Sequence, residues 1–149
     1  MGVVFIVANE ESPLLGLISL VAPIIAGGNS CVVLASESKP LSAVTFAEVL
    51  NSSDVPGGVV NILTGKLSEL ADHIARHMDL NAIAFDRAKE KKIVTAMQER
   101  AADNVKRVKK IDLDWTKADS ANPYLIQDFS ETKTTWHPIE TITASGSGY

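Results

Sequence analysis

Short apolar segments alternate with longer helical segments over the first 111 residues, and this alternation limits the possible folds more than any other feature of the chain. The apolar segments are rich in Val and Ile, which is typical of strands buried on both faces. Consecutive strands separated by helices call for right-handed crossovers that cover the faces of a parallel sheet. The sequence therefore predicts an α/β fold with a doubly wound parallel sheet, followed by an extended C-terminal β tail.

The expected elements can be placed by residue. Strands are predicted at Gly2–Ala8, Ser30–Ala35, Val59–Leu63, Ala82–Phe85 and Val105–Ile111. Helices are predicted at Leu14–Ala26 with Ser12 as N-cap, and at Pro40–Asn51, Leu67–His77 and Lys89–Ala102. We expect Pro23 to kink or shorten the first helix. The apolar side chains expected to face the core from the second helix are Leu41, Val44, Phe46, Val49 and Leu50.

The later part of the chain has a different pattern. Residues 112–123 are polar and read as a loop, Glu131–Ile139 has the threonine and aromatic content of a strand, and Ser145–Tyr149 is expected to fray.

Composition indicates one globular domain, because 46% of the 149 residues are hydrophobic and 21% are charged. The single cysteine, Cys31, cannot form an internal disulfide, and no signal stretch opens the sequence, so we expect a cytoplasmic protein. The longest nearly uncharged run, residues 12–36, is interrupted by proline and glycine and falls short of the ~20 apolar residues that span a bilayer. We expect no membrane partner.

Charge is unevenly distributed. Residues 87–110 carry nine basic and three acidic side chains, whereas the whole chain has a net charge of -4. This basic island either binds an anion or a nucleic acid, or it is a helix face exposed to solvent. Solvent-exposed faces are the commoner explanation of such charge runs. With two Trp and two Tyr the chain lacks the aromatic platform that single strands need, so no nucleic-acid partner is expected.

Several motifs occur in a specific order and spacing. They are PxxAxGN at 23–29, SExxPLSA at 36–43, VPxGVVNILTG at 55–65, HxDLxxIAF at 77–85 and NVKRV at 104–108. Together they resemble the coenzyme-binding half of the aldehyde dehydrogenase superfamily. FSETKT at 129–134 is similar to the segment that begins the family's oligomerisation strand. The chain most resembles the degenerate C-terminal unit of family-16 aldehyde dehydrogenases, and residues 132–138 of the tail favour this branch.

The resemblance implies NAD(P)-dependent oxidation of aldehydes with a cysteine nucleophile and a glutamate base. Ile111 stands at the glutamate position, and the catalytic-cysteine segment does not follow. Cys31 matches a strand position and is expected to be a small buried hydrophobe. The family's oxyanion asparagine corresponds to Glu11, and Asn9 could replace it only with a shift of register. We predict no catalytic residues, and the isolated chain is not expected to be an enzyme.

The coenzyme residues implied by the resemblance are vestigial: Glu37, Gly65 and Phe85 remain, while Leu34 replaces the ribose-binding lysine. The family's FTGS turn reads Phe85-Asp86-Arg87-Ala88, and Asp86 is predicted to cap the next helix where a phosphate would bind. No cofactor is expected, although weak NAD or NADP binding is possible. The alternative is a phosphate held by the basic side chains of the same turn, Arg87, Lys89, Lys91 and Lys92.

Histidines give little indication of a metal site. His73 and His77 have the i, i+4 spacing of zinc ligands on a helix, but no third ligand is evident, and surface or capping roles explain them better. His137 reads as an ordinary strand residue. No metal is expected.

The sequence therefore predicts a Rossmann-like domain at 1–111, a linker at 112–128 and an oligomerisation strand with a frayed end at 129–149. The predicted function is that of a truncated, catalytically incompetent family member acting in structure or assembly, as a homodimer or with a full-length aldehyde dehydrogenase subunit. An NAD(P) or nucleotide-binding module, and anion or nucleic-acid binding through 87–110, stay open as alternatives.

Overall fold

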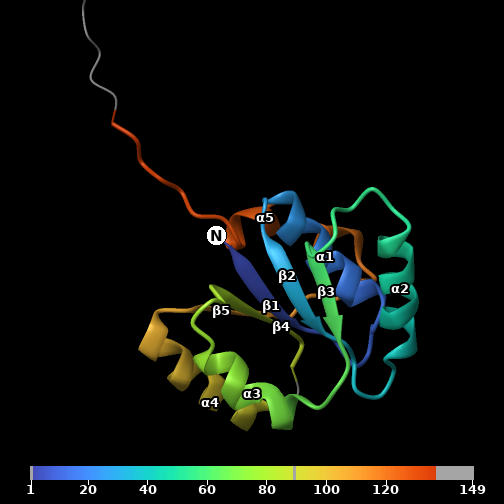
Figure 1. Cartoon of the computed structure of the whole chain (residues 1–149), viewed down its shortest axis with the longest axis horizontal. Coiled ribbons are helices and arrows are strands. Elements are labelled where there is room, and N and C mark those ends of the chain that lie inside the picture. The colour runs from blue at the N-terminus through green and yellow to red at the C-terminus, as the bar shows by residue number, and fades with distance from the viewer. Residues whose placement is uncertain (1, 89, 137–149) are drawn as a thin grey trace, which may run out of the picture.

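Five parallel strands form the centre of the computed structural model, which describes residues 2–88 and 90–136. The strands are β1 (Val3–Val7), β2 (Ser30–Leu34), β3 (Val60–Leu63), β4 (Ala82–Asp86) and β5 (Arg107–Ile111), and their order across the sheet is β3-β2-β1-β4-β5. Every neighbouring pair is parallel, with Val3 opposite Ser30 and Val4 opposite Ala82 in the central pairs. The predicted doubly wound α/β fold is confirmed (Figure 1).

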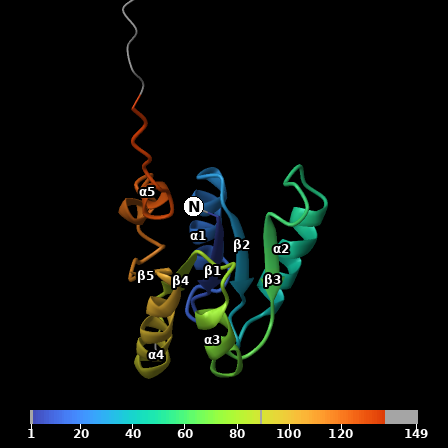
Figure 2. The ribbon, with the colours of Figure 1, turned by 60° about the vertical axis from the view of Figure 1, so that its left-hand side comes forward.

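Helices cover both faces of the sheet (Figures 1 and 2). Helices α1 (Leu15–Ala26) and α2 (Leu41–Asn51) pack on one face with the short α5 (Leu125–Asp128), and α3 (Leu67–Arg76) and α4 (Lys91–Ala101) pack on the other. Two 3-10 turns complete the structure, η1 (Ala102–Asn104) and η2 (Ala118–Ser120). The central strands are buried on both faces because side chains alternate along each strand between the two helix layers.

The first helix differs slightly from its prediction. It begins at Leu15 and continues through Pro23 to Ala26, and the carbonyl of Pro23 accepts the Gly27 N–H at 3.1 Å. Ser12 contributes its backbone carbonyl, which accepts the Gly16 N–H at 2.9 Å, while no side chain caps the helix.

The core prediction for α2 was wrong at three positions. Leu41, Val44 and Val49 are 78%, 42% and 56% exposed, and Ala43 is the buried residue of this helix. The physical reason is that α2 lies over the edge strand β3, whose own residues are half-buried or exposed. An edge strand gives a covering helix less surface to bury than a central strand does.

The segment that follows β5 packs against the α1 face instead of leaving the domain as an open loop. Trp115, Leu125 and Phe129 are at most 9% exposed and belong to the same core as α1. Asn29 fastens the end of the segment, since its Nδ2 donates to the Phe129 carbonyl at 2.9 Å. The segment contacts Asp86 of β4 and Arg107 of β5, so it lies beside α1 over these two strands.

The strand predicted at Glu131–Ile139 is not formed over residues 131–136, which are exposed and extend away from the sheet (Figure 1). A strand needs a paired neighbour, and no described part of this chain supplies one there. Residues 137–139, with His137, and the end predicted to fray, Ser145–Tyr149, lie outside the described residues.

Candidate functional site

The strand order reverses direction between β1 and β4, and in doubly wound sheets ligands bind outside the carboxyl ends of the strands at this point. A crevice of about 70 Å³ lies there. Glu37 and Gly65 both line it, from the loops that follow β2 and β3. Phe85 does not: it is 1% exposed and lines a separate, larger cavity beside β5. The structure therefore brings together two of the three predicted coenzyme residues.

The loop after β2 is already bound by a carboxylate of the chain itself. Glu10 accepts hydrogen bonds from the Ser36 hydroxyl at 2.7 Å, the Glu37 N–H at 2.7 Å, and the Ser38 N–H and hydroxyl at 3.2 and 2.5 Å. Burial raises the pKa of Glu10, but these four hydrogen bonds outweigh it and leave the pKa below its ordinary value. The donors that surround Glu37 are thus satisfied internally, next to a fixed negative charge. Glu10 was not among the predicted site residues, because no sequence motif indicates that it binds the loop after β2.

The prediction that Asp86 caps the next helix was wrong. Strand β4 includes Asp86, and α4 begins only at Lys91, preceded by Glu90, with no side-chain cap. Because neighbouring strand residues point to opposite faces, Phe85 turns toward α3 and α4 while Asp86 turns toward α1. There Asp86 is 1% exposed, and both its carboxylate oxygens accept the Trp115 indole N–H, at 3.0 and 2.9 Å.

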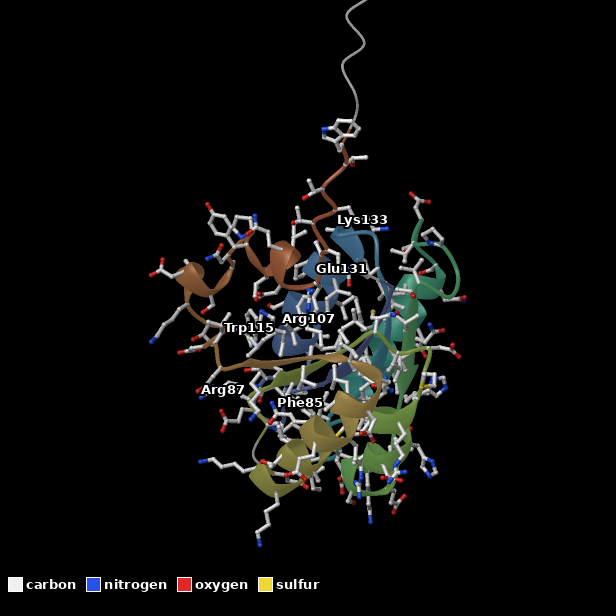
Figure 3. All side chains as sticks on the ribbon, turned by 90° about the vertical axis from the view of Figure 1, so that its left-hand side faces the viewer. Phe85, Arg87, Arg107, Trp115, Glu131 and Lys133 are labelled. Atoms are coloured by element: carbon white, nitrogen blue, oxygen red, sulfur yellow. The ribbon has the colours of Figure 1, made fainter. Side chains whose placement is uncertain are left out.

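Burial raises the pKa of Asp86 to about 6, against the lowering effects of the Trp115 hydrogen bond and of the Arg87 charge. Gly16 of α1 permits this arrangement. A Cβ at Gly16 would lie 2.4 Å from Asp86 Oδ2 and 3.1 Å from the Trp115 ring. Figure 3 shows Trp115, Arg87 and Phe85 near the same end of the sheet. An indole of the C-terminal segment therefore fills the α1 side of the switch point.

Arg87 follows β4 in the left-handed region, with φ at 47°. Its guanidinium pairs with Glu11 at 3.2 Å and with Asp112 at 3.3 Å. Glu11, which the resemblance placed at the oxyanion asparagine, is thus an ion-pair partner, and Asn9 accepts the Glu11 N–H at 2.7 Å.

The phosphate alternative relied on four basic side chains, of which Arg87 is already ion-paired. Lys91 lines the larger cavity with Arg87, Lys92 does not, and Lys89 lies outside the described residues.

Ile111, which the resemblance placed at the glutamate position, and Cys31, the single cysteine, are both buried. Ile111 is 6% exposed and packs into the core, and its carbonyl accepts the Arg87 N–H at 2.8 Å. Cys31 is fully buried in β2, as predicted, and burial raises the pKa of its thiol to about 12. A thiol with that pKa carries almost no thiolate near neutral pH, so it is a poor nucleophile.

Several side chains of the basic island form hydrogen bonds or ion pairs within the domain. Lys106 is 7% exposed, and its ammonium donates to the carbonyls of His77 and Leu80. Arg107 donates to the Asp128 and Ser130 carbonyls at 3.1 and 3.2 Å, and Lys109 pairs with Asp128 at 2.5 Å. These bonds attach the C-terminal segment to β5.

Within residues 2–88 and 90–136, no group of three or more His, Cys, Asp or Glu side chains is placed to hold a metal ion. His77 Nδ1 accepts the Asp79 N–H at 3.3 Å, a turn contact. Among the same residues, no helix has the length and apolar character needed to cross a membrane.

Comparison with known proteins decides the family. The model of the aldehyde dehydrogenase family matches residues 1–111, which are the five strands and the helices between them. The chain belongs to the aldehyde dehydrogenase family. It is 37% identical over 109 residues to a 2-aminomuconic 6-semialdehyde dehydrogenase of a Pseudomonas species, a match that covers 72% of this chain and 22% of that one. It is 39% identical over 85 residues to a hydroxyisobutyraldehyde dehydrogenase of Mycolicibacterium austroafricanum, covering 57% and 17%.

Solved aldehyde dehydrogenases give the same result. Aldehyde dehydrogenase C of Pseudomonas syringae, in a mutant form crystallised with NAD+ and octanal, superimposes with a TM-score of 0.68 at 32% identity, over 73% of this chain and 22% of that one. The enzyme of Bartonella henselae has a TM-score of 0.67 at 29% identity, with the same coverage. The chain therefore spans about a fifth of the length of its relatives, as a partial family domain.

Proposed function

We propose that this aldehyde dehydrogenase domain is catalytically incompetent and acts in structure or assembly, as a homodimer or with a full-length aldehyde dehydrogenase subunit. The observation that carries the proposal is Ile111. The carboxyl end of β5 is where the family resemblance places the glutamate base, and there the chain has an alkyl side chain packed in the core. An alkyl group can neither accept nor release a proton, so general-base catalysis has no group at this position.

Two further observations support the loss of coenzyme chemistry. Trp115 and Asp86 fill the α1 side of the switch point, and Glu10 binds the loop that carries Glu37. A dinucleotide would have to displace both sets of hydrogen bonds and approach two carboxyl groups. NAD or NADP binding is therefore expected to be weak.

The assembly role is supported by the outer side of α1. This helix contains no charged residue from Leu15 to Ala26, and a helix that is apolar all round is normally covered. Leu14, Leu15 and Ile18 are nevertheless 41%, 46% and 37% exposed in the single chain. Three large apolar side chains exposed within five residues are the kind of feature that marks protein contacts, and Leu41 at the start of α2 is exposed as well.

The catalytic part is tested by following NADH formation with short and aromatic aldehydes, using the full chain and Cys31→Ala. We expect no turnover from either protein. Turnover that disappears in Cys31→Ala would contradict the proposal, because it would make the buried thiol the nucleophile.

The assembly part is tested by light scattering over a range of concentrations, alone and after co-expression with a full-length aldehyde dehydrogenase of the same organism. Ile18→Lys should weaken association, whereas Thr95→Lys, an exposed position on the opposite layer, should not. A chain that stays monomeric and does not co-elute with the full-length enzyme would refute the assembly role.

One observation favours the NAD(P)-binding module as a second candidate: Glu37 and Gly65 do line a common crevice at the switch point. Isothermal calorimetry decides between the two functions. Low-micromolar NAD binding would support the module.

A further inference from the structure

A cavity of about 480 Å³ lies between α4 and β5 at the carboxyl edge of the sheet and is here called the α4–β5 cavity. Three core side chains form its floor: Phe85, Val94 and Ile111, which are 1%, 3% and 6% exposed. Its rim is polar and consists of Glu11, Arg87, Lys91, Thr95, Lys110 and Asp112. An apolar floor with a few convergent polar groups, in this range of volumes, is the usual form of a small-molecule site.

Charge on the rim selects the kind of ligand. Among the described residues of the rim, three cationic side chains stand with two carboxylates, which gives one net positive charge. Arg87 is already paired with both carboxylates, those of Glu11 and Asp112. Lys91 and Lys110 form no ion pair with any residue in the described part of the chain. The positive charge left for a ligand therefore lies on these two lysines.

We propose that the α4–β5 cavity binds an organic monoanion with an apolar body. The apolar body contacts Phe85, Val94 and Ile111, and the anionic group lies between Lys91 and Lys110. A neutral ligand would leave the two ammonium groups unused. A dianion such as a phosphate monoester would bring two negative charges to a rim whose described side chains carry one net positive charge, next to the carboxylates of Glu11 and Asp112.

This site differs from the crevice between β1 and β4. The two share only Arg87 and Ala88 as lining residues, and neither Glu37 nor Gly65 lines the α4–β5 cavity. The α4–β5 cavity is instead lined by Ile111 and Glu11, the positions that the resemblance assigned to the glutamate base and the oxyanion asparagine. Anion binding in this cavity and NAD binding in the crevice are therefore measured separately.

The test uses three probes that share one ring system and differ in charge: naphthalene-2-sulfonate, 2-naphthol and 2-naphthyl phosphate. Each is titrated into the isotopically labelled full chain, and backbone amide shifts are followed by NMR. We expect naphthalene-2-sulfonate to bind with a Kd below about 1 mM and to shift amides near Val94, Thr95 and Ile111. We expect 2-naphthol to bind at least about fivefold more weakly, and 2-naphthyl phosphate to bind no more tightly than the sulfonate.

Variants then locate the site. Lys91→Gln with Lys110→Gln should weaken sulfonate binding at least about fivefold, whereas Lys92→Gln, the next residue on α4 and outside the cavity lining, should not. Thr95→Trp should block the rim, and Glu99→Trp, one turn further along α4, serves as its control. Each variant exchanges an exposed side chain, so folding is preserved and can be checked by circular dichroism.

The proposal is refuted by any of three outcomes. The parent chain could fail to bind the sulfonate, the shifted amides could cluster away from α4 and β5, or the double lysine variant could bind as tightly as the parent. Tighter binding of 2-naphthyl phosphate would also overturn it, because the site would then prefer a dianion.

Discussion

Replacing Asp86 with asparagine tests the buried contact between β4 and the C-terminal segment. The Asp86 carboxyl group is 1% exposed and accepts the Trp115 indole N–H on both oxygens. Burial nevertheless raises its pKa from 3.8 to about 6, so the folded chain binds the proton of Asp86 more tightly than the unfolded chain does. Ionisation of Asp86 at neutral pH therefore lowers the free energy of unfolding.

The size and sign of the effect follow from linkage. A rise of about two pKa units corresponds to about 3 kcal/mol of differential stability. The stabilisation gained from the proton on Asp86 is fully present below about pH 4 and is lost as the pH rises through about 6. Asparagine is uncharged throughout, and its Oδ1 still accepts from Trp115. We expect Asp86→Asn to raise the free energy of unfolding by about 1–3 kcal/mol at pH 7 and to change it little at pH 4.

Urea unfolding between pH 4 and 7, followed by tryptophan fluorescence, measures this difference. Asp119→Asn is the matched control, because Asp119 is exposed in the same segment and should show no such pH dependence. The reasoning would be refuted if Asp86→Asn lowered stability at pH 7 by more than about 1 kcal/mol, the value of one ordinary hydrogen bond. An unchanged pH slope relative to the parent would refute it as well.

Three further outcomes are expected. Gly16→Ala should lower stability by about 1–3 kcal/mol, because its Cβ would lie 2.4 Å from an Asp86 carboxylate oxygen, whereas Gly57→Ala meets nothing within 4 Å and should leave the Tm nearly unchanged. Cys31 should resist iodoacetamide at pH 8 until the chain unfolds, since its thiol is buried with a pKa of about 12; mass spectrometry measures the labelling, and rapid labelling of the folded chain would contradict this. Phe129→Ala should cost about 3–5 kcal/mol in urea unfolding, because the ring is fully buried; an unchanged midpoint would show that the C-terminal segment does not stabilise the domain.

Local patterns were sufficient to predict the sheet and the helix order. Buried parallel strands need continuous apolar runs, and such runs at β1, β2 and β4 are visible without any tertiary information. The same logic failed for α2, where Leu41 and Val49 are as apolar as core residues but lie above an edge strand. Whether an apolar helix face is buried depends on which strand lies beneath the helix. The local sequence of the helix does not indicate whether that strand is central or at the edge of the sheet.

The candidate site was predictable only in part. Motif spacing located Glu37 and Gly65, which share a crevice, and placed Ile111 at the end of β5. The motif also suggested a helix cap for Asp86, but the alternation of side chains along β4 turned it to the opposite face, toward Trp115. Asp86 and Trp115 are 29 positions apart, and no local sequence pattern around either residue predicts that they are in contact.

The sequence by itself determined the α/β class and the family, because each is a property of residue types in a fixed order. Only the tertiary structure decided where the C-terminal segment goes. Its Trp115 and Phe129 bury against α1, and its backbone is held by Asn29 and Arg107. The physical reason is that burial and hydrogen bonding between distant segments depend on the folded shape, which brings β4 and β5 side by side and presents Asp86 and Arg107 to this segment.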